Sequence, residues 1–420
     1  MYRASSYARR AGLFLNNTLR PSRKRLATLM IYATDLCDSA CKHCLIWAKR
    51  PVHYLPKDRI VALMESACVT KDTTVGLEGG EFLLHPEALD IMRWFHEHHP
   101  NFDPLSNALK PDRLVEAVRR YPPQRLYLSL DGDRETYRTM RGKDGYDNVV
   151  RAVETLRGVV PISVMFTLSP FNDFDDLRHV AEVCRTGGVD LRVGIYNNIA
   201  FFDTIDPAHV AGVGTHKGTP PLLFKEARAR IENGLLADLP VLAGDDGAAD
   251  DDGAAGAAEE ASFIEQIPDV VRQFRENYDF LVLYDAWRRK QLRLRCHSIL
   301  DSLVVLPDGD VPLCQHLDLK LGNIYSATLD EIFNGPETQR LQHHYSHNCN
   351  ACWVNFHRKY DIVLYRSLER FFPKVAVEKL LGFYQWCADR DATYRSVMAA
   401  PEQAIAPAAA STPGAVAPVP

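Results

Sequence analysis

The sequence lacks a hydrophobic run long enough to cross a membrane, because no apolar stretch reaches about 18 residues. Its first 32 residues also lack the apolar core and the small-residue cleavage site of a secretory signal, so we expect a cytoplasmic protein. A strong charge of either sign is missing as well. With 49 Lys and Arg against 54 Asp and Glu, the net charge is −5, which argues against general nucleic-acid binding.

What remains is the composition of a soluble globular protein, with 46% hydrophobic and 25% charged residues. A chain of 420 residues is long enough for two domains with substantial cores. The ten cysteines, several of them at short spacings and without a secretory signal, favour metal ligation over disulfides. Cys68, Cys184 and Cys387 lie in helical patterns, and we expect them to be core thiols.

Strand-like and helix-like segments alternate from about residue 26 to residue 197. The expected strands are residues 26–34, 73–77, 103–106, 125–130, 162–168 and 191–196. The expected helices are residues 56–68, 86–98, 111–120, 146–157 and 175–186. Six strands that alternate with helices predict an α/β fold, with a parallel sheet and helices outside it. Catalytic residues of such barrels lie at the carboxyl ends of the strands.

Three cysteines follow the first expected strand in a C-x3-C-x2-C run: Cys37, Cys41 and Cys44. If the ten cysteines were placed at random, the expected number of such runs in a chain of this length would be only about 0.006. The spacing would also place the three on one face of a helix, as buried thiols. The run leaves a strand and its other positions are mostly polar, so a cubane iron–sulfur site is the better interpretation. Three thiolates leave one iron open for a small molecule.

The run resembles the cluster motif of the radical S-adenosylmethionine (SAM) superfamily, with His43 as the aromatic residue before the last cysteine. Gly79-Gly80-Glu81 ends the second strand and resembles the family's G-G-E-P element, with Phe82 in place of proline. Ser106-Asn107 ends the third strand. The run Ser129-Leu130-Asp131-Gly132, followed by Arg141-Gly142, resembles the S-L-D-G…R-G signature of members with an extra cluster domain.

This resemblance implies a partial (β/α)6 TIM-like barrel, a [4Fe–4S] cluster on Cys37, Cys41 and Cys44, and SAM on the open iron. SAM would be cleaved to methionine and a 5′-deoxyadenosyl radical that abstracts a hydrogen from the substrate. The expected SAM contacts are Gly79, Gly80, Glu81, Asn107, Ser129, Asp131 and Arg141. A turn at the glycine pair, a helix cap at Asp131 and an ion pair at Arg141 are the structural alternatives.

A second set of four cysteines follows in the C-terminal half: Cys296, Cys314, Cys349 and Cys352. Two apolar runs around a Pro307-Asp308-Gly309 turn predict a hairpin between the first two. With Gly322-Asn323-Ile324, the region resembles the small α+β SPASM/Twitch domains, which implies one auxiliary [4Fe–4S] cluster in the shorter, Twitch-like form. Its expected role is electron transfer. Zinc is the rival metal, with His343, His344 and His347 nearby as further ligands.

The resemblance implies a radical SAM oxidoreductase or maturase, and the preferred substrate is a small molecule or sugar. A peptide substrate is the first alternative. Only 36 residues precede Cys37, too few for the winged-helix module of many peptide-modifying relatives or for a cobalamin domain. The second alternative is a non-catalytic iron–sulfur or zinc scaffold. An external donor such as flavodoxin or ferredoxin would supply electrons, and no nucleic-acid partner is expected.

The expected organisation places a basic N-terminal arm at residues 1–25, the radical SAM core at 26–198 and a connector at 199–262. That connector contains a disordered acidic insertion at 243–261. The auxiliary-cluster domain follows at residues 263–360, C-terminal helices at 361–398 and a disordered tail at 399–420. The basic start and the aromatic, basic C-terminal helices raise the alternative of a peripheral membrane contact.

Overall fold

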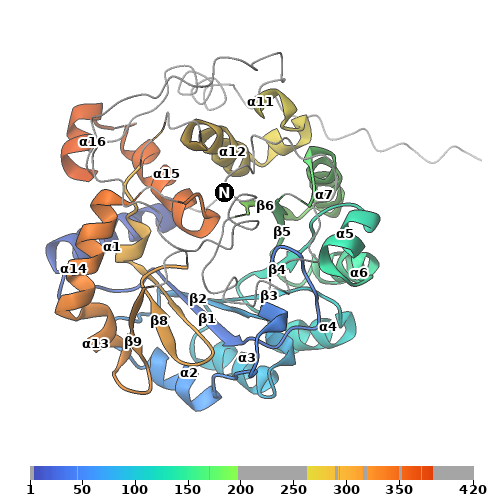
Figure 1. Ribbon diagram of the computed structural model, residues 1–420, viewed down its shortest axis with the longest axis horizontal. Coiled ribbons are helices and arrows are strands. Elements are labelled where there is room, and N and C mark those ends of the chain that lie inside the picture. Colours follow the sequence, from blue (N-terminus) through green and yellow to red (C-terminus); the bar gives the residue numbers. More distant parts are fainter. Residues whose placement is uncertain are drawn as a thin grey trace, which may run out of the picture.

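The computed structural model describes residues 4–44, 46–169, 171–196, 263–288, 292, 294–315, 319–349, 352–369 and 371–381. Its centre is a sheet of seven parallel strands in the order β6-β5-β4-β3-β2-β1-β7. The strands are β1 (Thr28–Thr34), β2 (Thr74–Gly79), β3 (Phe102–Ser106), β4 (Leu126–Ser129), β5 (Ile162–Leu168), β6 (Asp190–Ile195) and β7 (Ser302–Val305). The sheet curves into an open half-barrel with helices on its outer side (Figure 1).

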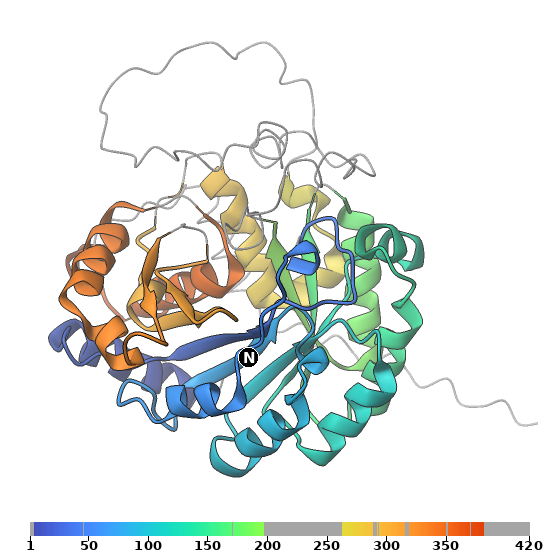
Figure 2. The ribbon, with the colours of Figure 1, turned by 60° about the horizontal axis from the view of Figure 1, so that its bottom comes forward.

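The helices between these strands form an outer layer around the sheet in Figure 2. They are α2 (Lys57–Met64), α3 (Ala88–His98), α4 (Pro111–Arg120), α5 (Arg134–Arg141), α6 (Tyr146–Leu156) and α7 (Phe174–Gly187). The α/β fold class predicted from the alternation is confirmed, as is the partial barrel that the resemblance implies. The expected strand and helix ranges agree with the structure to within a few residues, but α5 was not predicted as a helix.

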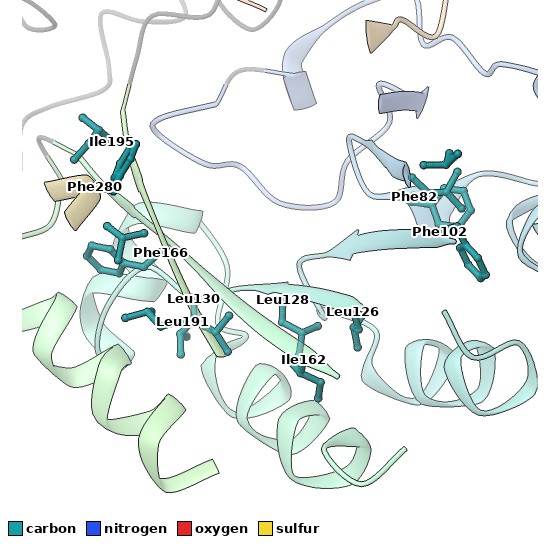
Figure 3. Close-up of a cluster of buried hydrophobic side chains, with 14 of the residues drawn as sticks. Phe82, Phe102, Leu126, Leu128, Leu130, Ile162, Phe166, Leu191, Ile195 and Phe280 are labelled. Atoms are coloured by element: carbon teal, nitrogen blue, oxygen red, sulfur yellow. The ribbon is translucent and has the colours of Figure 1, made fainter. Parts of the chain in front are cut away.

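The two faces of the sheet differ in the side chains they bury. On β1, Leu29 and Ile31 face the helices and join the main hydrophobic core, whereas Met30 and Tyr32 face the lumen and contact Val304 of β7. Figure 3 shows the outer core around β3 to β6, where aromatic and aliphatic side chains fill the space between strands and helices. This alternation, with period two along each strand, divides the side chains between the outer core and the lumen.

The C-terminal part consists of short helices and a two-stranded antiparallel sheet. Its helices are α11 (Phe263–Gln266), α12 (Arg275–Arg288), α13 (Leu329–Asn334), α14 (Pro336–Asn348), α15 (Asn355–Glu369) and α16 (Lys374–Leu381). Its two-stranded sheet pairs β8 (Asp310–Pro312) with β9 (Lys320–Asn323). Short 3-10 turns are η1 (Ile46–Ala48), η2 (Phe82–Leu84), η3 (Asp269–Gln273) and η4 (Ser298–Leu300).

The predicted hairpin around Gly309 forms only as a turn, in which the Leu306 amide donates to the Asp310 carbonyl. Its two arms belong to different sheets. β7 adds to β1 in parallel, through pairs such as Leu29 with Leu303, while β8 pairs with β9. A strand from the C-terminal part therefore completes the barrel sheet.

The first helix, α1 (Ala4–Leu19), lies against the C-terminal part, where the Asn17 amide donates to the Leu300 carbonyl at 3.1 Å. The expected connector, its acidic insertion and the tail fall outside the described residues, as does Cys387. No helix in the described ranges is long and apolar enough to span a bilayer. Cys68 and Cys184 are buried in the core, as predicted.

Candidate active site and auxiliary-cluster site

The loop that carries Cys37, Cys41 and Cys44 leaves the carboxyl end of β1, at the rim where the sequence predicted it. It is held from the side by the C-terminal end of α5. The Ala40 amide donates to the Arg141 carbonyl at 2.9 Å, and the Lys42 amide donates to the Met140 carbonyl at 2.8 Å. Cys41 is buried, whereas Cys37 and Cys44 are half-buried. Backbone hydrogen bonds to α5 therefore fix the cysteine loop at this rim.

The glycine pair lies directly against the segment that enters this loop. Gly79 has φ +122°, and a Cβ on it would lie 2.2 Å from the Thr34 carbonyl oxygen. A Cβ on Gly80 would lie 2.1 Å from the Leu36 carbonyl oxygen. The Gly80 amide donates to Thr34, and the Glu81 amide donates to Leu36. Only glycine permits this close approach, so the pair fixes the path of the chain into Cys37.

The Glu81 carboxylate is buried and accepts three hydrogen bonds. Ser106 Oγ and the Leu83 amide donate to Oε1 at 3.0 and 3.3 Å, and the Asn107 amide donates to Oε2 at 2.8 Å. Burial raises the pKa of Glu81 to about 7, and these hydrogen bonds oppose that rise. Glu81 thus joins the ends of β2 and β3 within the structure.

The Asn107 side chain extends this connection to the cysteine loop. Its Nδ2 donates to Asp38 Oδ1 at 2.9 Å and lies 3.9 Å from Cys37 Sγ. Its Oδ1 accepts from the Leu109 amide at 2.9 Å. Glu81, Asn107 and Cys37, which the sequence predicted to act together, are therefore neighbours.

Asp131 and Arg141 form a buried ion pair. Arg141 Nε donates to Asp131 Oδ2 at 2.8 Å, Arg141 Nη2 contacts the same oxygen, and the Thr167 amide donates to Oδ1 at 2.9 Å. Arg141 Nη1 also lies 3.9 Å from Cys41 Sγ. Ser129 is buried at the end of β4. The pair connects β4 and β5 to the helix end that supports the cysteine loop.

His43 lies between Cys41 and Cys44, and its Nδ1 is buried without a hydrogen-bond partner. Burial lowers its pKa to about 4, and the Arg141 cation contributes to that lowering. The ring is therefore neutral at neutral pH. Three thiols at a barrel rim, with a buried ring nitrogen left unsatisfied between them, form a donor set that suits a cubane with one open iron.

The second cysteine set lines one cavity in the C-terminal part. Its wall is formed by Cys296, Cys314, Cys349, Cys352, Ile299, Leu313, Tyr345, His357 and Arg358. Cys296 and Cys352 are buried, and burial raises the pKa of both thiols. Four converging thiols in a largely apolar wall fit a cluster ligated wholly by protein.

The three histidines weighed as zinc ligands do not line this cavity. His343, His344 and His347 lie on α14, and His347 Nδ1 bonds the His343 carbonyl at 2.7 Å. Within the described residues, no three Cys, His, Asp or Glu side chains stand close enough to hold a single metal ion. Ligands of one zinc ion lie about 3.8 Å apart, from Zn–S bonds of about 2.3 Å, while a cubane holds its thiolates further apart.

Tyr32 lies between the two cysteine sets. Its hydroxyl accepts a hydrogen bond from Gln315 Nε2 at 2.6 Å, and Gln315 follows Cys314 directly. Burial raises the pKa of Tyr32, and the neighbouring Glu78 and Cys44 raise it further. This link could not be predicted from the sequence, since nothing in the pattern of β1 distinguishes Tyr32 from a core tyrosine.

Two family models match the chain. The model of the radical SAM superfamily covers residues 31–184, and the model of an iron–sulfur cluster-binding domain, SPASM, covers residues 296–353. The chain belongs to the radical SAM superfamily. It is a radical SAM enzyme with a C-terminal SPASM domain, and its cofactors are the [4Fe–4S] cluster of the superfamily and a SPASM auxiliary cluster. The scaffold and zinc alternatives are thereby set aside.

The GTP 3′,8-cyclase of Ectopseudomonas mendocina (strain ymp) is 24% identical over 189 residues, which is 42% of this chain and 56% of that protein. The chain thus matches just over half the length of this relative. Streptococcus suis SuiB bound to S-adenosylmethionine shares 14% identity at a TM-score of 0.47, over 81% of this chain and 74% of SuiB. AdoMet-bound anSMEcpe shares 15% identity at a TM-score of 0.45, over 88% of this chain and 98% of anSMEcpe. These distant likenesses carry no conclusion about the substrate.

The matched model is the SPASM domain, while the shorter Twitch-like form with a single auxiliary cluster stays a prediction. Among the cavity residues that sequence reasoning missed, two have side chains that can carry charge: His357 and Arg358. They follow Cys352 on a segment rich in charged and aromatic residues, where the sequence suggested a peripheral membrane contact as an alternative. The burial of an arginine six residues after a cluster cysteine produces no periodic pattern in the sequence from which it could be predicted.

Proposed function

We propose that this radical SAM enzyme holds its SAM-cleaving [4Fe–4S] cluster on Cys37, Cys41 and Cys44, and its auxiliary cluster on Cys296, Cys314, Cys349 and Cys352. When bound, the first cluster and SAM supply one electron and a carbon radical that abstracts a hydrogen from the substrate. The observation that carries the proposal is the cysteine loop, fixed by α5 and by the glycine pair at the carboxyl rim of the half-barrel.

The remaining site residues have positioning roles in this proposal. Gly79 and Gly80 bring backbone carbonyls close to the loop, where they suit the ammonium group of SAM. Asn107 and Ser129 lie at the ends of β3 and β4 and face the same rim. Glu81 connects β2 to β3. The half-barrel and the C-terminal part exclude water from an unselective radical.

Asp131 and Arg141 can contact SAM only through hydrogen-bonding positions that their ion pair does not already use. Asp131 is fully buried, and its oxygens already accept from Arg141 and the Thr167 amide. We therefore propose that they act on SAM mainly by fixing the cysteine loop.

Two substrate classes are compatible with this arrangement, a small molecule or sugar and a peptide. Among the distantly similar structures, SuiB is bound to its precursor peptide SuiA and anSMEcpe to a Cp18Cys peptide, whereas the matched relative is a GTP 3′,8-cyclase. In both classes the auxiliary cluster accepts the electron that the substrate radical releases. A flavodoxin or ferredoxin is the proposed external donor to the first cluster.

Anaerobic reconstitution with iron, sulfide, SAM and dithionite tests the proposal. Two cubanes predict about eight irons per chain, together with release of 5′-deoxyadenosine. Replacing Cys41 with alanine should abolish that release. The double variant Cys349→Ala and Cys352→Ala should lose about half the iron and still cleave SAM. A reconstituted protein with both clusters and no 5′-deoxyadenosine would contradict the proposal.

Incubation with cell-extract fractions separates the two substrate classes. With an extract from cells grown in deuterated medium, deuterium transfer into 5′-deoxyadenosine from a peptide fraction would favour a maturase, and transfer from the low-molecular-weight fraction would favour a small-molecule oxidoreductase. Flotation with anionic liposomes tests the peripheral membrane contact, which is withdrawn if the protein stays in the aqueous fraction.

A further inference from the structure

The cavity lined by the four C-terminal cysteines contains one fully buried cation, Arg358. Its Nε donates to the Cys352 carbonyl at 3.0 Å and its Nη1 donates to the Leu294 carbonyl at 3.1 Å. The same Nη1 lies 3.4 Å from Asp361 Oδ2. The side chain has no exposed surface. A guanidinium keeps its proton at every pH that a protein tolerates, so this site carries a permanent positive charge.

The partner carboxylate, Asp361, is equally buried and lies one turn further along α15. Its Oδ1 accepts from the His297 amide at 3.0 Å, next to Cys296. Arg358 lines the cavity together with the four cysteines, whereas Asp361 is not among the residues that line it. Because Arg358 Nε also donates to the Cys352 carbonyl, the pair brings its cation, and not its carboxylate, to the cavity wall.

We propose that Arg358 is a positioning residue for electron transfer, whose fixed charge raises the reduction potential of the auxiliary cluster, while Asp361 lowers it. This inference rests on the proposed assignment of that cluster to Cys296, Cys314, Cys349 and Cys352. One-electron reduction adds one negative charge to the cluster. A cation that water does not screen stabilises the reduced form more than the oxidised form.

The proposed direction suits the proposed reaction. A substrate that has lost a hydrogen atom must give up one further electron to complete a two-electron oxidation. A cluster with a raised potential accepts that electron more readily. Lysine would serve less well in this place, because burial lowers its pKa and the charge would be lost with a proton.

A purely structural role is the competing explanation, because Arg358 also ties two backbone carbonyls together. The two roles differ in one measurable quantity. A structural role predicts changes in stability and iron loading, whereas a charge effect moves the midpoint potential of a fully loaded cluster.

The test is an anaerobic redox titration of the full chain, with dithionite and mediators, followed by electron paramagnetic resonance. Alanine replaces Cys37, Cys41 and Cys44, so that the paramagnetic resonance signal comes from the auxiliary cluster alone. Iron is counted first, and about four irons per chain are required. The holoenzyme is titrated alongside, to show that the auxiliary signal is the same in both.

Charges are then removed one at a time. Asp361→Asn should move the midpoint to a more positive potential than in the parent. Adding Arg358→Gln to Asp361→Asn should move it back to a more negative potential. This background prevents proton uptake by Asp361 from masking the loss of the cation. Arg358→Lys in the same background should keep the raised potential only at low pH and lose it as the pH rises through the lowered pKa of the buried lysine.

Equal midpoints for Asp361→Asn with and without Arg358→Gln, at full iron content, would overturn the proposal in favour of a structural role. If Arg358→Gln fails to load iron, Asp361→Asn alone decides, and an unchanged or lowered midpoint there would also overturn it. A parent chain with no iron at the four C-terminal cysteines would instead refute the proposed function, which the iron count reveals before any titration.

Discussion

At the scale of single residues, the candidate site is defined by buried groups whose charges are compensated locally. Asp131 and Arg141 illustrate this: each is shielded from water, and each satisfies the other at hydrogen-bonding distance. Such a pair adds little net stability over apolar residues, but removal of one partner leaves an uncompensated buried charge. A substitution in this buried pair should therefore lower the free energy of unfolding far more than the same substitution in an exposed ion pair.

Asp131→Asn should lower the free energy of unfolding by about 3–5 kcal/mol, because Arg141 is left as an unpaired buried cation. Urea unfolding under anaerobic conditions measures this change. Asp147→Asn is the matched control, since it breaks the exposed pair with Arg134 and should leave the urea midpoint unchanged. Equal midpoints for the two variants would show that the buried pair is not coupled to stability.

Glu78 gives a second residue-scale prediction, for pH dependence. It faces the lumen beside Tyr32 in the register of β1 and β2, and burial, with the nearby Asp103, raises its pKa from 4.5 to about 7. Between these pH values the folded protein keeps a proton that the unfolded chain has lost. This group therefore contributes less stability as the pH rises, and the loss is complete above about pH 7.

Glu78→Gln removes this titration. Its melting temperature, relative to the native protein, should rise by a few degrees as the pH increases from 4.5 to 7.5. Circular dichroism melts across that range measure it. Glu116→Gln, on the exposed side of α4, is the control and should show no trend. A constant difference for Glu78→Gln would mean that the folded protein ionises Glu78 normally.

At the scale of elements, α5 has a function that its short length would not suggest. Its C-terminal carbonyls hold the cysteine loop, and Gly142 ends it in the left-handed conformation with φ +65°. A Cβ on Gly142 would lie 2.9 Å from the Cβ of Ala40 in the loop. Gly188 ends α7 with the same φ of +65°, but has no neighbour within 4 Å of such a Cβ. A comparison of substitutions at these two glycines therefore distinguishes the effect of backbone strain, which both share, from the effect of contact with the loop, which only Gly142 has.

Gly142→Ala and Gly188→Ala should therefore share a backbone cost of about 1–2 kcal/mol. Gly142→Ala alone should also push Ala40 outward and reduce the iron bound at Cys37, Cys41 and Cys44. Iron analysis of both variants in a Cys349→Ala, Cys352→Ala background measures that effect directly. Equal iron content in the two variants would show that the contact with Ala40 is not needed for loading.

Element-level prediction from the sequence succeeded where the signal was local. Residues 111–120 were recognised from proline at the helix start and apolar periodicity, and α4 spans Pro111–Arg120. The segment around Gly309 shows the limit of such signals. Its turn was correctly predicted, but the partner of residues 302–305 was not, because the pairing with β1 spans more than 270 residues. Arg358 was missed for a related reason, since its burial depends on elements far away in the sequence.

At the scale of the whole molecule, the two parts share one sheet and one hydrophobic core. β7 covers the edge of β1, and Gln315 bonds Tyr32 across the same boundary. Asn334 of α13 accepts from the Lys24 amide at 2.8 Å, so the N-terminal segment is also held by the C-terminal part. The half-barrel is therefore not expected to be stable alone.

A fragment of residues 1–196 would expose the β1 edge, where Leu29, Met30 and Ile31 pair with β7 in the full chain. Apolar strand edges pair with one another, so this fragment should aggregate, and size-exclusion chromatography should find it in the void volume. Met30→Lys in the fragment places a charge on the lumen face of that edge and should increase the soluble fraction. The full chain, prepared in parallel, should stay soluble. A monomeric, folded fragment would instead mean that β7 contributes little to the half-barrel, and that the two parts meet as separately stable domains.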